Sequence, residues 1–200
     1  MTNTKWIFFH IGSTLIDESE CYKLRYFEAV AGTTIRHDDF ERNAIEFSKQ
    51  NLKGDHEAVK YYGIELPPWH KEAEKPYDNT ESVFERLVVK GYRLGVIANQ
   101  SLGTKDRLSS WGLLKYFDVV LAPAEEGVSK PDSEMFHRAL AKAKCLPIHA
   151  VMIGQQHRTH QKSWHENGMD KTRSWSTRAI HKNEQADYEI ENLSRLLDIF

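Results

Sequence analysis

The chain has 200 residues, of which 40% are hydrophobic and 28% charged, and its formal net charge at pH 7 is −2. This length fits one domain, or one domain with a small insertion. The near-balanced charge argues against a general nucleic-acid or membrane-surface role, and no run of about 18 apolar residues exists to span a membrane. The sequence thus predicts a globular protein without nucleic-acid or membrane partners.

Two observations concern the cellular compartment. Cys21 and Cys145 are the two cysteines; they stand far apart, in no metal-type spacing, and fit a reducing compartment better than a disulfide framework. The first residues lack the basic start and long apolar stretch of a signal peptide. We therefore expect a cytoplasmic protein.

The predicted elements begin with a short, continuously apolar strand over residues 5–9, of the kind that is buried in a parallel sheet. Residues 19–60 then show helical periodicity, with Cys21, Leu24 and Phe27 on the predicted inner face of the first helix. A proline-containing linker follows over 64–79. The histidines of this region, His37, His56 and His70, are expected to be exposed.

Strands and helices alternate after the linker. Thr80 is a candidate N-cap for a helix whose predicted inner face is Val83, Leu87 and Val88, and which Gly91 ends. The later elements are strands over 93–99, 117–122 and 150–154, helices over 101–114 and 130–145, and a short strand and closing helix within 186–200. Pro131 is predicted in the first turn of the 130–145 helix. Residues 155–185 have few apolar positions, and we expect weak packing there.

This alternation predicts an α/β fold, a doubly wound parallel Rossmann-like sheet. The helical block after the first strand is too long for a crossover. It is predicted to be an inserted cap. We expect residues 1–15 and 79–200 to form the core, and 16–78 the helical cap and linker.

Four motifs resemble, in order, those of the haloacid dehalogenase-like (HAD) hydrolase superfamily, in its small helical cap subclass. They are FFHIGSTL, GVIANQS, EEGVSKPDSEMFHRAL and HAVMIGQQHRTHQKSWHENGM. The resemblance implies hydrolysis of small phosphate esters through an aspartyl-phosphate, with Mg²⁺ held by carboxylates. It also implies that Lys130 binds the substrate phosphate.

The chain departs from the family pattern at its acids. His10 stands at the nucleophile position, Gly12 at the proton-handling position and Ala98 at the hydroxyl position of the second motif. Gln155 and His160 replace acids of the fourth motif. Mg²⁺ prefers a hard oxygen shell, so we expect it to bind poorly.

Three roles are open for His10. It is an inert replacement, a ligand for a softer metal such as Zn²⁺ together with Gln155 and either His160 or His157, or a nucleophile that accepts phosphate. Asn99, Gln100 and Ser101 cap the next helix or donate to an anion. The candidate site therefore comprises His10, Gly12 and Lys130 as catalytic residues, Thr14, Asn99, Gln100, Ser101 and Lys130 as substrate-binding residues, and His10, Gln155 and His160 as metal ligands.

The sequence predicts a phosphatase-type scaffold with impaired catalysis and a small phosphorylated molecule as its ligand. The alternatives are a pseudoenzyme that binds a phosphorylated ligand or a partner without turnover, and a hydrolase with an altered, histidine-containing metal site. Whether the chain is an enzyme, and its oligomeric state, stay open.

Overall fold

The computed structural model describes residues 4–50, 52–99, 103–128, 132–154, 170–174 and 188–200. These residues form two compact units. One contains the chain up to Ile16 and from Pro76 onward, and the other contains Asp17–Lys75. Short strands lie at both crossings between the units, β2 (Ile16–Asp17) and β3 (Lys75–Pro76), and they pair with each other.

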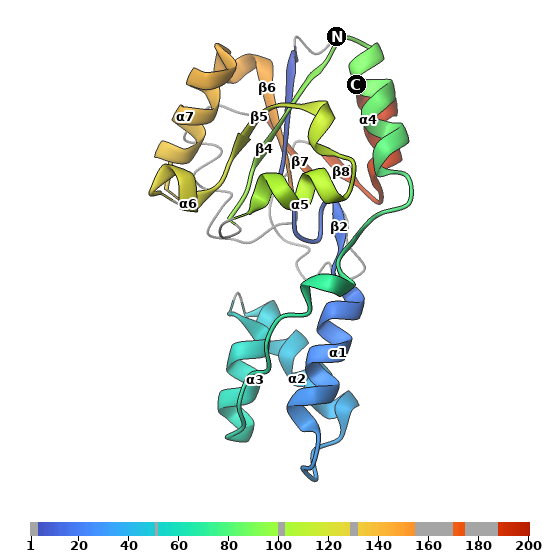
Figure 1. Cartoon of the computed structure of the whole chain (residues 1–200), viewed down its shortest axis with the longest axis vertical. Helices are drawn as coiled ribbons and strands as arrows, with labels where there is room; N and C mark the ends of the chain where they lie inside the picture. The colour runs from blue at the N-terminus through green and yellow to red at the C-terminus, as the bar shows by residue number, and fades with distance from the viewer. Residues whose placement is uncertain (1–3, 51, 100–102, 129–131, 155–169, 175–187) are drawn as a thin grey trace. The chain divides into compact units, whose positions relative to one another are not determined.

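A parallel six-stranded sheet forms the centre of the first unit (Figure 1). Its order is β5-β4-β1-β6-β7-β8. The strands are β1 (Trp6–Phe9), β4 (Arg93–Ile97), β5 (Phe117–Leu121), β6 (Ala150–Gly154), β7 (Asp170–Ser174) and β8 (Tyr188–Ile190). Every pairing among them is parallel, which confirms the predicted doubly wound α/β fold.

Strand β1 lies between β4 and β6, with Phe9 opposite Val96 on one side and Ile153 on the other. Alternate side chains of a strand point to opposite faces. Ile7 and Phe9 accordingly pack in one core cluster, and Trp6 and Phe8 in another. All four are buried, which explains why WIFF is continuously apolar rather than alternating.

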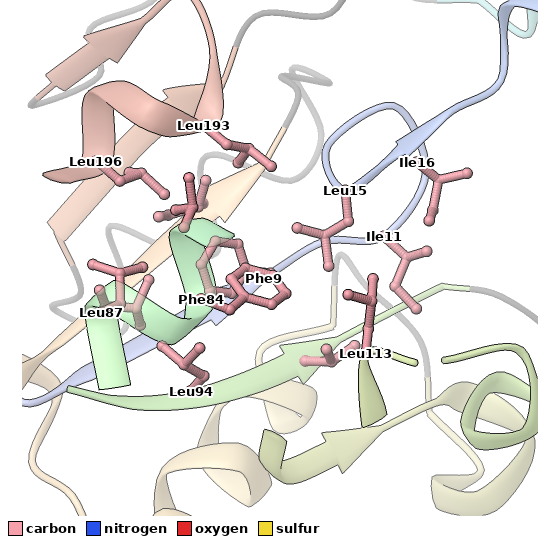
Figure 2. Close-up of a cluster of buried hydrophobic side chains, with 14 of the residues drawn as sticks. Phe9, Ile11, Leu15, Ile16, Phe84, Leu87, Leu94, Leu113, Leu193 and Leu196 are labelled. Atoms are coloured by element: carbon pink, nitrogen blue, oxygen red, sulfur yellow. The ribbon is translucent and has the colours of Figure 1, made fainter. Parts of the chain in front are cut away.

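Helices cover both faces of the sheet (Figure 1). On the Phe9 side lie α4 (Thr80–Val89) and the C-terminal α9 (Leu196–Ile199), whose Phe84, Leu87 and Leu196 surround Phe9 and Leu94 (Figure 2). On the Phe8 side lies α7 (Glu134–Ala143). The described residues of this unit also form α5 (Thr104–Ser110), α6 (Pro123–Glu126) and the 3₁₀ turns Leu114–Tyr116, Pro147–His149 and Leu193–Arg195.

Two expectations for helix α4 were wrong. Asn79, not Thr80, occupies the N-cap position, and Thr80 is a buried first-turn residue whose hydroxyl contacts the Leu15 carbonyl at 3.5 Å. Val88 is 45% exposed, and Phe84 takes the inner position instead. The Phe84 ring packs beside Phe9, with 5.0 Å between the two ring centroids. The buried face of α4 therefore includes Phe84 in place of Val88.

The 130–145 helix begins later than predicted. Helix α7 starts at Glu134, and the Asp132 side chain accepts a hydrogen bond from the Glu134 amide at 2.9 Å. Pro131, predicted in the first turn, lies outside the described residues. The Asp132 carboxylate competes with helix continuation by satisfying a free amide locally. Residues 155–185 were expected to pack weakly. The structure describes only β7 of this range, so the expectation stays a prediction.

The second unit is helical and has its own core. Its helices are α1 (Ser19–Val30), α2 (His37–Lys49) and α3 (Gly54–Tyr62), followed by a 3₁₀ turn at Lys71–Ala73. The core consists of Tyr26, Ala29, Val30, Phe40, Ala44, Ala58 and Val59. The predicted inner face of α1 was wrong at two positions, because Leu24 and Phe27 are 37% and 51% exposed. Phe27 instead stacks on the His37 ring at 4.0 Å.

His70 lies between two carboxylates within this unit. Its Nε2 is 2.9 Å from Glu28 of α1, and its Nδ1 is 2.9 Å from Glu72. A neutral imidazole has one N–H, so both contacts are hydrogen bonds only when the ring is protonated. The hydrogen bond to Glu28, and then the one to Glu72, raises the pKa of His70 above its ordinary value. The expectation that His37 and His70 are exposed was wrong, since their side chains are 17% and 18% exposed.

A first prediction concerns Gly95 in β4. A Cβ atom there would lie 2.5 Å from Cε1 of the fully buried Phe8 ring. We expect Gly95→Ala to lower the free energy of unfolding by about 1–3 kcal/mol, as overpacked cores do. Chemical denaturation measures it. In a double-mutant cycle, Phe8→Leu should offset part of this loss; strictly additive effects would contradict the steric explanation.

A second prediction concerns pH. Because the folded state raises the pKa of His70, its contribution to stability should be full below the unfolded pKa of about 6.5 and disappear as pH rises through the folded pKa. Denaturation of wild type and His70→Gln at pH 6 and pH 9 should show a larger difference at pH 6. His56→Gln, at an exposed position on α3, is the control. An equal difference at both pH values would refute the linkage.

Candidate active site

His10 directly follows the central strand of the sheet. Its backbone N–H donates to the Ile153 carbonyl of β6 at 2.8 Å, extending the ladder one residue past β1. In a parallel sheet, ligands bind beyond the carboxyl ends of the strands. His10 therefore stands, partly buried, at the edge where the ends of β4, β1 and β6 are adjacent.

A tight turn follows His10 and fixes its surroundings. The Ile11 carbonyl accepts hydrogen bonds from the amides of Thr14 at 3.1 Å, Leu15 at 2.9 Å and Ile16 at 3.3 Å. Ser13 adopts a left-handed backbone with φ 51°, a conformation uncommon for a residue that carries a Cβ. The turn buries Gly12 and Thr14, so both predicted site residues lie in one short, highly constrained segment.

The predictions had missed the backbone of this turn. The Ile11 carbonyl and the left-handed Ser13 organise it, yet neither is a motif side chain. The only sequence signal is the cluster Gly-Ser-Thr after an apolar run, which favours a turn without specifying its hydrogen bonds.

The end of β4 contributes a second segment to the same edge. The Ala98 amide donates to the Leu121 carbonyl of β5 at 3.0 Å, and Ala98 is fully buried while Asn99 is exposed. The alternative that residues 99–101 cap the next helix is wrong for Asn99. Helix α5 begins at Thr104, after Gly103 with φ 86°, because a glycine there permits a turn that other residues resist.

Five candidate residues lie outside the described part of the chain, so their predicted roles stay predictions: Gln100, Ser101, Lys130, Gln155 and His160. For Gln155, the preceding residue is described. Gly154, the residue before Gln155, is the buried last residue of β6, and β6 is hydrogen-bonded to β1.

The described residues at this edge do not fit the hard oxygen shell that Mg²⁺ prefers. Those that directly follow β1 and β4 are His10, Ile11, Gly12, Ala98 and Asn99, and none carries a carboxylate. Within the described ranges, no three His, Cys, Asp or Glu side chains are grouped to hold a metal ion. Nor does this part of the chain contain a helix long and apolar enough to cross a bilayer.

Comparison with known families agrees with this architecture. The profile of the haloacid dehalogenase-like hydrolases matches residues 1–170. The chain belongs to this family. It is 26% identical over 211 aligned residues to the pyrophosphatase PpaX of Bacillus velezensis, with 96% of this chain and 94% of that protein covered.

Two further comparisons concern a related phosphatase sequence and a solved structure. A glyceraldehyde 3-phosphate phosphatase of Methanothermobacter thermautotrophicus is 37% identical over 83 residues, which cover 41% of this chain and 37% of that enzyme. The crystal structure of a HAD phosphatase from Thermococcus onnurineus superposes with a TM-score of 0.69 at 22% identity, covering 98% and 97% of the two chains. At that identity the superposition establishes the fold.

A third prediction concerns the metal. Neutral groups in place of two carboxylates remove most of the ligand charge that offsets Mg²⁺ dehydration. Titration calorimetry should therefore give a dissociation constant for Mg²⁺ weaker than about 1 mM, the weak end of carboxylate sites. Micromolar affinity would contradict the prediction. Zn²⁺ titrated into the same protein, and into His10→Ala, tests the histidine-ligand alternative.

Proposed function

We propose that this member of the family is a phosphatase-type scaffold that binds a small phosphorylated molecule, with Mg²⁺-dependent hydrolysis absent or very weak. One observation carries the proposal. The residue that follows the central strand β1 is His10, where the family motif has its aspartate nucleophile. The relatives named for pyrophosphatase and glyceraldehyde 3-phosphate phosphatase activity support a small phosphorylated ligand class.

The chemistry of the substitution supports impairment. An aspartate nucleophile also neutralises bound Mg²⁺ and forms an acyl phosphate, whereas a neutral imidazole brings no charge to the metal. Gly12 has no side chain to move a proton, and Ala98 has no hydroxyl to donate to phosphate oxygens. The chain keeps Thr14, Asn99 and Lys130, which are suited to binding an anion. Binding is thus favoured over turnover.

A fourth prediction tests the proposal by restoring the acids. The double variant His10→Asp with Gln155→Asp should regain Mg²⁺-dependent hydrolysis of an aryl phosphate, because β1 and β6 are adjacent and both ends are fixed in the sheet. Each single change should do little, since nucleophile and metal ligand act as one unit. Loss of a nucleophile typically costs about 10⁶-fold, so rescue would stand far above background.

The matched control is His10→Asn with Gln155→Asn, which has similar side-chain size without the charge and should stay inactive. Unmodified protein that turns over at about 1 s⁻¹ or faster, within the ordinary enzyme range, would refute the impaired-site proposal. A folded but inactive double aspartate variant would show that more than two acids are missing, with Ala98 and His160 as the next positions to restore.

A further inference from the structure

The return segment, residues 64–74, follows the last helix of the helical unit and leads into β3, where the chain leaves that unit. Its beginning is attached to the unit by apolar packing. Ile64 and Leu66 pack against the core of the three helices, and the Ile64 amide donates to the Val59 carbonyl at 3.0 Å. The contacts that its later residues make with α1 therefore determine how freely the chain moves just before it leaves the unit.

Arg25 of α1 holds the middle of the return segment. Its Nε donates to the Pro67 carbonyl at 2.7 Å, and its Nη1 donates to the Asp55 carboxylate of α3 at 2.7 Å. The guanidinium carbon also lies 5.4 Å from the centroid of the Trp69 ring, within the range of a cation–π contact. A guanidinium stays charged throughout the pH range of folded proteins, so this attachment does not depend on pH.

His70, the next residue, makes an attachment of a different kind. Its Nε2 lies 2.9 Å from the Glu28 carboxylate of α1, and its Nδ1 lies 2.9 Å from the Glu72 carboxylate. When the ring loses its proton, one N–H remains for two carboxylates, and the lone pair of the other nitrogen faces an anionic oxygen. The neutral ring can therefore donate to Glu28 or to Glu72, but not to both.

The position of Glu28 explains why the protonated ring is favoured on α1. Glu28 lies in the last turn of that helix, which contains no basic residue. A negative charge near a helix C-terminus is unfavourable, and a cation there is stabilising. Protonated His70 supplies that cation from the return segment. Glu72 belongs to the return segment itself, so only the contact with Glu28 attaches His70 to a helix.

Charged side chains on α1, α3 and the return segment lie around His70. They are Arg25, Glu28, Asp55, Lys71, Glu72 and Glu74. Arg25 and Asp55 pair with each other, and Glu74 accepts a hydrogen bond from the Trp69 indole N–H at 2.7 Å. Hydrogen bonding to Glu28, and then to Glu72, raises the pKa of His70. The two carboxylates thus outweigh the neighbouring cations.

We propose that His70 is a pH-sensitive attachment of the return segment: the protonated ring holds residues 70–74 to α1 through Glu28, and the neutral ring releases them. Arg25 keeps residues 67–69 in place in both states. The attachment is complete below the unfolded pKa of about 6.5 and is lost as pH rises through the higher folded pKa. The released stretch lies between Trp69 and β3, which makes the effect local.

Chymotrypsin cleavage after Trp69 in the full-length protein tests the proposal. Cleavage of a folded chain follows its local opening, and cleavage after Tyr61, an exposed residue of α3 in the same unit, is the internal reference. Dividing each variant's rate by that of wild type at the same pH removes the pH dependence of the protease. Glu28→Ala should raise cleavage after Trp69 about threefold at pH 6, and less than about 1.5-fold at pH 9, the upper and lower parts of the range for exposed ion pairs.

Two variants serve as controls. Glu20→Ala removes an acid from the first turn of the same helix, where its partner is Lys23, and should leave cleavage after Trp69 unchanged at both pH values. Arg25→Lys keeps a charge beside Asp55, but one ammonium cannot reproduce the guanidinium fork that also reaches the Pro67 carbonyl. It should raise cleavage by similar factors at pH 6 and pH 9. Circular dichroism establishes that each variant is folded, and Glu28→Gln replaces Glu28→Ala if the latter is not.

Cleavage that rises after Trp69 but not after Tyr61, and rises in the Glu28 variant at pH 6 but not at pH 9, would support the attachment. An NMR titration in which the same variant lowers the pKa of His70 would support it as well. Equal effects of the Glu28 variant at both pH values, or no effect at pH 6, would overturn it. Cleavage that rises in parallel after Tyr61 would also overturn it, because the whole helical unit would then be loosened.

Discussion

Strand β1 is the constraint on which the rest of the sheet depends. It is hydrogen-bonded to β4 on one edge and β6 on the other, and its four side chains are buried on both faces. Backbone groups buried this way must be paired, so β1 cannot shift without breaking two ladders. The same pairing continues through the His10 amide. The position of the candidate site is therefore set by the core and not by the chemistry of residue 10.

The fold therefore does not depend on which side chain stands at position 10. Catalytic carboxylates at strand ends repel one another when no metal is present, and functional sites often reduce stability. The Ile11-centred turn, by contrast, uses backbone groups alone. Nothing in the hydrogen bonding of this turn requires an acid. The backbone geometry around position 10 is therefore compatible with a histidine or with an acid.

The sequence was sufficient for β1, β4, β5 and β6, but it did not predict β7, and it was insufficient for the helix faces. β6 matches its predicted bounds because a continuous apolar run between turns has one interpretation in a parallel sheet. Helix α1 failed at Phe27, because a ring contact with His37, a residue of another helix, accommodates an exposed phenylalanine. The start of α7 failed because Asp132 satisfies the Glu134 amide locally. Both errors depend on side-chain contacts that periodicity does not encode.

The same distinction applies to the candidate site. His10 and Asn99 could be assigned to one edge because each follows a predicted strand, and adjacent parallel strands bring their ends together. The contact among Glu126, Glu134 and Arg138 could not be foreseen. Glu134 and Arg138 are four residues apart, an ordinary helical pair worth a few tenths of a kcal/mol, and only the tertiary packing of α6 brings Glu126 to the same guanidinium. The positions of strand ends are thus readable from local pattern, whereas a contact between separate helices becomes visible only in the folded chain.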